Sequence, residues 1–255
     1  MFRSLCSAFL MYSRIPMPKI EWKEETRRYA LGFFPLVGAV IGGLLILWRI
    51  VCSKLCIGQF LFASVAAFLP IVVTGGIHLD GFCDVNDARA SYGDKRKKLE
   101  IMSDPHIGSF AVIKLCIYLI MQTALYSQVY SLRTTAVVAL SFVLSRSLSG
   151  LTAVTFKSAK SGGTLQSFVR PAHKRITVAM ELIFIIISIC TSLFFQPFQG
   201  AAAVIAAFLV LVWHRHTAYR DFGGITGDLC GWFLQMSEIF MLAAVVFTER
   251  TAALW

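Results

Sequence analysis

Three aspartates, Asp80, Asp84 and Asp87, share one short polar stretch between long apolar runs. Residues three and four apart lie on the same face of a helix, so a helical conformation would place these three carboxylates side by side. Unpaired carboxylates in such a row repel one another, and the pattern therefore favours a bound cation. The spacing predicts a divalent-metal site that acts on phosphate groups.

A second acidic pair, Glu100 and Asp104, follows a basic turn formed by Lys95 to Lys98. We expect two helix ends that both present carboxylates and together hold Mg²⁺, which prefers oxygen ligands and shares its shell with substrate phosphates. Such an ion would neutralise a diphosphate and orient an attacking hydroxyl. The alternative is a solvated loop in which these acids balance Arg89 and the four basic residues.

The segment 221–228, DFGGITGD, is the third candidate piece. Its glycines allow the backbone to approach an anion closely, so we expect Gly224 and Thr226 to contact substrate phosphate. Asp228 could complete the metal site. An ordinary glycine-rich loop of a membrane protein is the alternative interpretation.

Arg146 lies within an apolar run, where a charge is costly unless it faces a partner or a polar cavity. We expect it to bind phosphate or organise the site; a structural ion pair is the alternative. Arg14 is a candidate for attracting an anionic substrate, against the alternative of an ordinary basic residue beside a membrane. His78 and His106 flank the acids and could accept a proton or form structural hydrogen bonds.

Composition indicates a membrane protein. The chain has 255 residues, of which 57% are hydrophobic and 15% charged, against about 45–50% and about 25% in ordinary globular domains. The excess lies in long runs, which predicts an all-α polytopic membrane bundle in one domain, residues 1–255, with an interfacial segment over about 1–30. The net charge of +10 does not indicate nucleic-acid binding, because the basic residues lie between apolar runs rather than in a patch with aromatic residues.

We predict seven membrane spans, with polar loops at 156–177 and 214–231. Gly38, Gly42 and Gly43 in the first span are expected to let a neighbouring helix approach closely. The predicted spans cover about 34–52, 60–74, 110–129, 134–155, 176–195, 201–213 and 232–247.

The charge distribution predicts the orientation. The segments 1–35, 76–107, 156–177 and 214–231 hold 18 Lys and Arg residues, and the alternate connections hold four. The positive-inside rule then places the N-terminus and the acidic insert on the cytoplasmic side of the cell membrane.

Several stretches, in matching order over nearly the whole chain, resemble the cobalamin synthase family, also called adenosylcobinamide-GDP ribazoletransferases. The specific ones are GGIHLDGFCDVNDA and LEIMSDPHIGSFAV, accompanied by SRIPMP, FFPLVGAVIGG and GGITGDLCGW. Ala88 and Ala111 stand where the family pattern leads us to expect glycine, and Cys83 and Asn86 are atypical. These departures concern local backbone shape, because none of them removes a carboxylate.

The resemblance implies a multi-pass enzyme that joins adenosylcobinamide-GDP to α-ribazole, or its 5′-phosphate, and releases GMP with Mg²⁺ required. A hydroxyl of the ribazole would attack the phosphate attached to cobinamide. The best metal or catalytic candidates it implies are Asp80, Asp84, Glu100, Asp104 and Asp228, with Asp87 next. A homo-oligomer, or an association with other enzymes of cobalamin biosynthesis, stays open.

Two other functions stay open. The acid cluster followed by Ala88-Arg89 partly matches the CDP-alcohol phosphotransferases, which make phospholipids, although the glycine positions of that pattern are not kept. An ion or metal transporter with acidic gating residues is the non-enzyme alternative. A transporter would place its carboxylates within spans, near the middle of the bilayer, whereas these lie in polar inserts.

Overall fold

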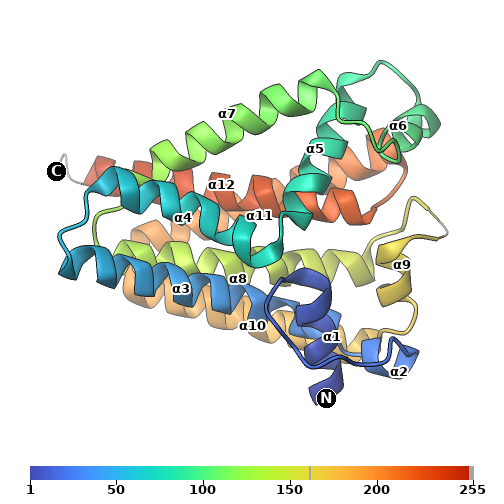
Figure 1. Ribbon diagram of the computed structural model, residues 1–255, viewed down its shortest axis with the longest axis horizontal. Coiled ribbons are helices and arrows are strands. Elements are labelled where there is room, and N and C mark those ends of the chain that lie inside the picture. Colours follow the sequence, from blue (N-terminus) through green and yellow to red (C-terminus); the bar gives the residue numbers. More distant parts are fainter. Residues whose placement is uncertain (161, 253–255) are drawn as a thin grey trace.

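The apolar runs form long helices that lie side by side along the longest axis of the molecule (Figure 1). The computed structural model describes residues 1–160 and 162–252. In chain order the helices are α1 (Phe2–Tyr12), α2 (Glu24–Arg27), η1 (Leu31–Phe33), α3 (Phe34–Lys54), α4 (Gln59–Thr74), α5 (Ile77–Ala90), α6 (Lys95–Ile101), α7 (Ser109–Tyr126), α8 (Leu132–Thr155), α9 (Thr164–Val169), α10 (Lys174–Phe195), α11 (Pro197–Thr217), η2 (Ala218–Phe222) and α12 (Gly227–Ala252).

The helix lengths agree with the prediction of a polytopic membrane bundle. In the described part of the chain, six helical stretches are long and apolar enough to cross a bilayer. The pair α4 and α5 also qualifies when its two helices are taken together, although they meet at an angle of 95°. If that pair counts as one span, the total is the predicted seven.

Helix α8 is the centre of the bundle. It is rich in small and β-branched residues and is buried along almost its whole length. The helices α3, α10 and α12 pack around it, and Figure 1 shows α8 running between them. A membrane bundle packs closely where small side chains let backbones approach, so the composition of α8 explains its central position.

Two of the three glycines singled out in α3 form its contact with α8. A side chain at Gly38 would collide with the carbonyl oxygen of Phe142, and one at Gly42 would lie 2.6 Å from the carbonyl oxygen of Ala139. Gly43 has no atom within 4 Å of its missing side chain. The expected close approach is therefore confirmed at Gly38 and Gly42, and it does not involve Gly43.

The predicted polar loop at 214–231 is wrong for most of its length. Helix α11 continues to Thr217, the π-helical turn η2 follows, and α12 already begins at Gly227. Polar residues lower the hydropathy here because they lie at the end of the bundle and contact one another, while the backbone stays helical. Only 223–226 is a true connection. The predicted loop at 156–177 likewise contains the short helix α9 and the start of α10.

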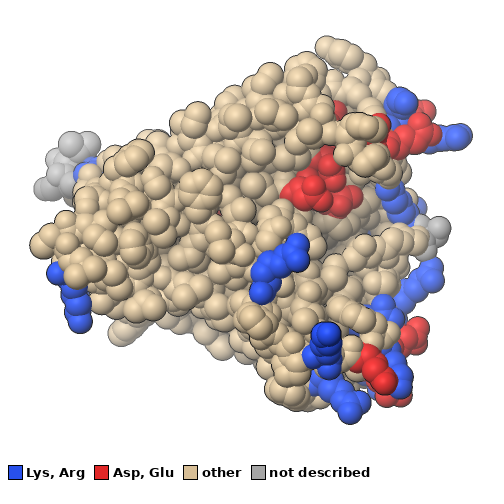
Figure 2. Space-filling view, in the orientation of Figure 1, with Lys and Arg blue, Asp and Glu red and all other residues tan. Residues whose placement is uncertain are grey.

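Charged side chains gather at one end of the bundle. Figure 2 shows acidic and basic side chains over the end that carries α2, α5, α6 and α9, while the long middle of this face is free of them. The N-terminal helix α1 packs at the same end against α3, with Cys6 and Ala8 buried. An uncharged belt and one highly charged end are what a membrane bundle with an exposed functional end requires.

The α3–α8 contact predicts opposite outcomes for neighbouring glycines. Gly38→Ala and Gly42→Ala should each lower the stability of the detergent-solubilised protein by about 1–3 kcal/mol, because the added methyl group meets backbone rather than a movable side chain. Gly43→Ala is the matched control and should leave the unfolding temperature unchanged or raise it. Equal destabilisation by all three substitutions in thermal unfolding would contradict this packing.

Candidate active site

A glycine hinge turns the chain from α4 into the acidic helix α5. Gly75 and Gly76 have φ values of +66° and +80°, in the left-handed region that other residues rarely adopt. The two helices consequently meet at 95°, and α5 runs across the end of the bundle instead of along it (Figure 1). Even if α4 and the start of α5 count as one broken span, the acidic part of α5 lies at the charged end of the bundle, outside the membrane-spanning part of the chain.

Two more glycines bring α5 against the start of α12. A side chain at Gly81 would lie 2.8 Å from Cα of Asp228, and one at Gly231 would lie 3.0 Å from the carbonyl oxygen of His78. Each helix therefore contacts the backbone of the other directly. This crossing places Asp228 beside the aspartates of α5, although they are more than 140 residues apart in the chain.

Asp80, Asp84 and Asp228 form the acidic centre of the site. The α5 segment is helical, so the predicted common face exists. Burial, followed in order by the neighbouring charges of Asp80, Asp228 and Asp87, raises the pKa of Asp84 to about 7. Figure 2 shows a compact acidic patch on the surface. Crowded carboxylates of this kind interact favourably with a cation.

Asp87 belongs to the same row but has a structural contact. Its carboxylate accepts hydrogen bonds from the backbone N–H groups of Gly108 and, at 2.8 Å, Ala111. These are free N–H groups at the start of α7, and a carboxylate there satisfies them and interacts favourably with the helix dipole. Asp87 thus fastens α7 to α5.

Glu100 and Asp104 lie apart from this centre. Glu100 pairs with Arg96 and Lys97 on α6, at 3.2 Å and 3.7 Å. Helix α6 ends at Ile101, so Glu100 lies on it, Asp104 lies beyond its end, and the two acids do not share one helical face. Hydrogen bonds from the backbone and ring of His106 lower the pKa of Asp104. Among the described residues, neither acid is one of the charges that act on Asp84 or Asp228.

The glycine-rich segment also has a structural explanation. A side chain at Gly224 would collide with the carbonyl oxygen of Lys157, where Ile225 and Ser158 form a single β-bridge. The hydroxyl of Thr226 accepts a hydrogen bond from the N–H of Leu229, 3.2 Å away, at the start of α12. These contacts hold the connection that leads to Asp228, and the predicted role of Gly224 and Thr226 in phosphate binding stays a prediction.

Sequence reasoning missed the importance of Asp221. This buried carboxylate of η2 is 2.9 Å from Nε of Arg220, and 3.5 Å from both Nε of Arg89 and Nζ of Lys98. It therefore connects the end of α5, helix α6 and the corner between α11 and α12. The basic residues Lys95 to Lys98 could have indicated this role of Asp221, because clustered cations are stabilised by an acidic partner.

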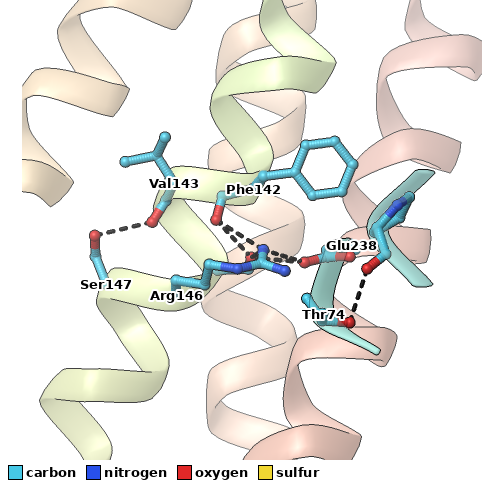
Figure 3. A network of polar contacts seen from close by, with 8 residues as sticks. Thr74, Phe142, Val143, Arg146, Ser147 and Glu238 are labelled. Atoms are coloured by element: carbon cyan, nitrogen blue, oxygen red, sulfur yellow. Dashed lines mark hydrogen bonds and ion pairs between the residues drawn. The ribbon is translucent and has the colours of Figure 1, made fainter. Parts of the chain in front are cut away.

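Arg146 lies below the acidic centre, inside the bundle. Its guanidinium donates to a carboxylate oxygen of Glu238, 2.6 Å away, and to the carbonyl oxygen of Phe142 (Figure 3). Both charged side chains are almost completely buried. The guanidinium also lies 5.9 Å from the ring centre of Phe34. This geometry supports the alternative of a structural ion pair, which connects α8 to α12.

Two cavities meet at Asp80. The inner cavity, of about 270 Å³, lies between α1, α3, α5, α8 and α12, and its lining includes Tyr12, Phe34, His78, Asp80 and Asp228. The hinge cavity, of about 600 Å³, is more open and is lined by Arg14, the two hinge glycines, Asp80 and Cys83, among others. Asp80 thus faces both cavities, and Met11 and Ile77 line both as well.

The carboxylate oxygens of the acidic centre suit a hard cation such as Mg²⁺, although the side chains do not converge on one position. In the described part of the chain, no three His, Cys, Asp or Glu side chains are close enough together to hold a metal ion. Mg²⁺ commonly takes one or two carboxylates and completes its shell with water and substrate phosphates. Asp80, Asp84 and Asp228 are the residues that could hold such an ion.

The fold and site define a polytopic helical membrane protein with a carboxylate-lined site at one end of the bundle. The chain belongs to the cobalamin-5-phosphate synthase family, whose model matches residues 4–246. It is 42% identical to an adenosylcobinamide-GDP ribazoletransferase of Lachnoclostridium phytofermentans, over 96% of this chain and 94% of the relative. Relatives with the same name from Geobacillus kaustophilus and Clostridium perfringens strain 13 are 31% and 27% identical, over 93% of this chain and 93% and 94% of theirs. No solved structure matches the chain.

Substitutions of Asp84 and Asp87 should change the free energy of unfolding differently. Asp87→Ala should lower the free energy of unfolding by about 1 kcal/mol, because it removes the cap of α7. Asp84→Asn should leave stability unchanged or raise it in metal-free buffer, because it removes a repelling charge from a crowded site. Thermal unfolding in EDTA measures both effects, and a stabilising Asp87→Ala would contradict the capping role.

The Arg146–Glu238 pair predicts strong coupling between α8 and α12. Arg146→Met should lower stability by about 3–5 kcal/mol, because it leaves an unpaired carboxylate in the bundle. The double variant Arg146→Met with Glu238→Leu should recover most of that loss, since an apolar pair suits an apolar interior. Additive losses in a double-mutant cycle would show that the two charges do not depend on each other.

Proposed function

We propose that this protein transfers the cobinamide phosphate group of adenosylcobinamide-GDP to α-ribazole, or its 5′-phosphate, at the acidic centre formed by Asp80, Asp84 and Asp228. The observation that carries the proposal is the crossing of α5 and α12, which places Asp84 and Asp228 near Asp80, the carboxylate at which two cavities meet. The names of the family and of its relatives supply the substrates.

The proposed reaction is a nucleophilic substitution at phosphorus. A hydroxyl oxygen of the ribazole forms a bond to the phosphorus attached to cobinamide, the bond from that phosphorus to GMP breaks, and the hydroxyl proton leaves to a carboxylate of the site. Mg²⁺ held by Asp80, Asp84 and Asp228 would neutralise the diphosphate and the departing GMP. Arg14, which lies against the hinge in the hinge cavity, would bind the donor's diphosphate.

Glu100 and Asp104 enter this proposal differently. They lie on or just after α6 and would reach the diphosphate only when the substrate extends toward that helix. Lys160 lies between the two regions, because its ammonium donates to Ser103 at 2.7 Å and also acts on Asp228. We therefore propose that both acids contact the donor outside the acidic centre.

The proposal places the charged end of the bundle in the cytoplasm. The excess of Lys and Arg in the segments at this end supports that orientation by the positive-inside rule. Water-soluble nucleotide substrates would reach this end without crossing the bilayer. The same charged surface is where a second copy, or another enzyme of cobalamin biosynthesis, would dock.

The direct assay uses protein purified in detergent and measures GMP release and corrinoid product. With adenosylcobinamide-GDP, α-ribazole 5′-phosphate and Mg²⁺, we expect turnover that EDTA abolishes. Asp80→Asn, Asp84→Asn and Asp228→Asn should each lower kcat by about 100-fold or more. Asp94→Asn is the matched control and should keep wild-type activity, because Asp94 only caps α6 through the N–H of Lys97 and Asn also caps helices well.

Three outcomes would overturn the proposal. Wild-type protein that releases no GMP from these substrates would exclude the transferase activity. Release of CMP from a CDP-alcohol lipid, without GMP from the corrinoid donor, would instead assign the protein to phospholipid synthesis. Full activity of Asp84→Asn would move the reaction away from the acidic centre.

A further inference from the structure

The two cavities at Asp80 differ in size and in chemistry. The inner cavity measures about 270 Å³ and the hinge cavity about 600 Å³. A corrin macrocycle with its side chains is far too large for the inner cavity, whereas a bicyclic aromatic base is of a suitable size. A transferase that joins a large donor to a small acceptor has to bind the two on opposite sides of the reacting atoms.

Aromatic rings form one wall of the inner cavity. The ring of Tyr12 lies 4.2 Å from that of Phe34 between centroids, and Phe34 lies 5.6 Å from the imidazole of His78. Rings arranged in this way offer faces and edges to a flat aromatic ligand. Asp80 and Asp228 lie at the other side of the same space, where the ribose of a nucleoside would be directed.

Buried polar atoms without partners surround this wall. Among the described residues, Nε2 of His78 and both carboxylate oxygens of Glu181 are buried and have no hydrogen-bond partner. Buried polar groups are nearly always hydrogen-bonded, so each such atom requires an explanation. A ligand with polar ring atoms in the inner cavity would explain these atoms, because it would form hydrogen bonds with them.

Glycine makes room for one of these groups. Gly150 lines the inner cavity, and the carboxyl group of Glu181 on α10 occupies the space that a side chain at Gly150 would take. Glu181 also acts electrostatically on Tyr12, which lines the same cavity. The carboxyl group therefore lies directly behind Gly150, between α10 and the part of the cavity wall that α8 forms.

We propose that the inner cavity binds the aromatic base of the acceptor nucleoside, with Tyr12 and Phe34 against its rings and Glu181 at its polar edge. This inference rests on the proposed function and deepens it, since it assigns the acceptor to the inner cavity and leaves the hinge cavity to the donor. Residues that line only the inner cavity then determine which bases are accepted.

Filling the cavity tests the assignment. Ala153 lines the inner cavity and is 5% exposed. Ala153→Leu should raise the KM for α-ribazole 5′-phosphate at least about tenfold and leave the KM for adenosylcobinamide-GDP within about twofold. An acceptor with a single imidazole ring in place of the bicyclic base should be affected less, because it leaves room for the added side chain. General damage to the fold would change the KM values for both acceptors and for the donor together.

A matched pair at Glu181 tests the polar edge. Glu181→Gln keeps two hydrogen-bonding atoms and should keep the KM for the acceptor within about threefold. Glu181→Met has a similar volume but no such atoms, and it should raise that KM about tenfold or more. Because Met suits an apolar interior, thermal stability should not fall. A stable Glu181→Met protein with unchanged acceptor KM would overturn the contact with Glu181.

Direct binding separates this inference from the proposed function. Equilibrium dialysis of α-ribazole 5′-phosphate against wild-type protein requires no donor and no turnover. If wild type turns over but Ala153→Leu binds the acceptor normally, the inner cavity is not the acceptor site. If wild type releases no GMP, the proposed function fails first, whatever the dialysis shows.

Discussion

The close crossing of α5 over α12 is the constraint on which the site depends. It requires glycine on both helices, because the backbone of each lies where the side chain of the other would be. The hinge at Gly75 and Gly76 directs α5 into that crossing. Asp87 then fixes α7 to the outer side of the same helix. A carboxylate site assembled from distant parts of the chain is thus held mainly by backbone contacts.

Beneath the site, the bundle is organised around α8. Its small residues allow α3 to approach closely, and its one buried cation pairs with Glu238 of α12. A charge inside a membrane bundle is costly, and here a single partner compensates it close to Phe34 and His78, which line the inner cavity. The same helix therefore supports the fold and lines part of the inner cavity.

Much of this architecture could be predicted from local sequence patterns. Runs of apolar residues located the spans within a few residues, and the spacing of Asp80, Asp84 and Asp87 correctly predicted a shared helical face. Contacts between distant segments could not be predicted in the same way. The three cations around Asp221, the cap that Asp87 provides and the separation of Glu100 from Asp84 all depend on the direction in which α5 leaves the hinge. Hydropathy also placed the start of α12 too late in the chain, because polar residues at the end of a helix lower the hydropathy as much as a loop does.

The contacts around Asp221 have a consequence for motion at this end of the protein. Helix α6 has no fully buried residue, and it is attached to the bundle by the partly buried Leu99 and Ile101 and by the Lys98–Asp221 pair. Segments with little buried apolar surface open locally at far lower free energy than a packed core. Dissolved salt screens the exposed pairs of Glu100 with Arg96 and Lys97 far more than the largely buried Lys98–Asp221 pair. Higher ionic strength should therefore loosen the exposed face of α6 first, while its contact with Asp221 and the membrane bundle stay in place.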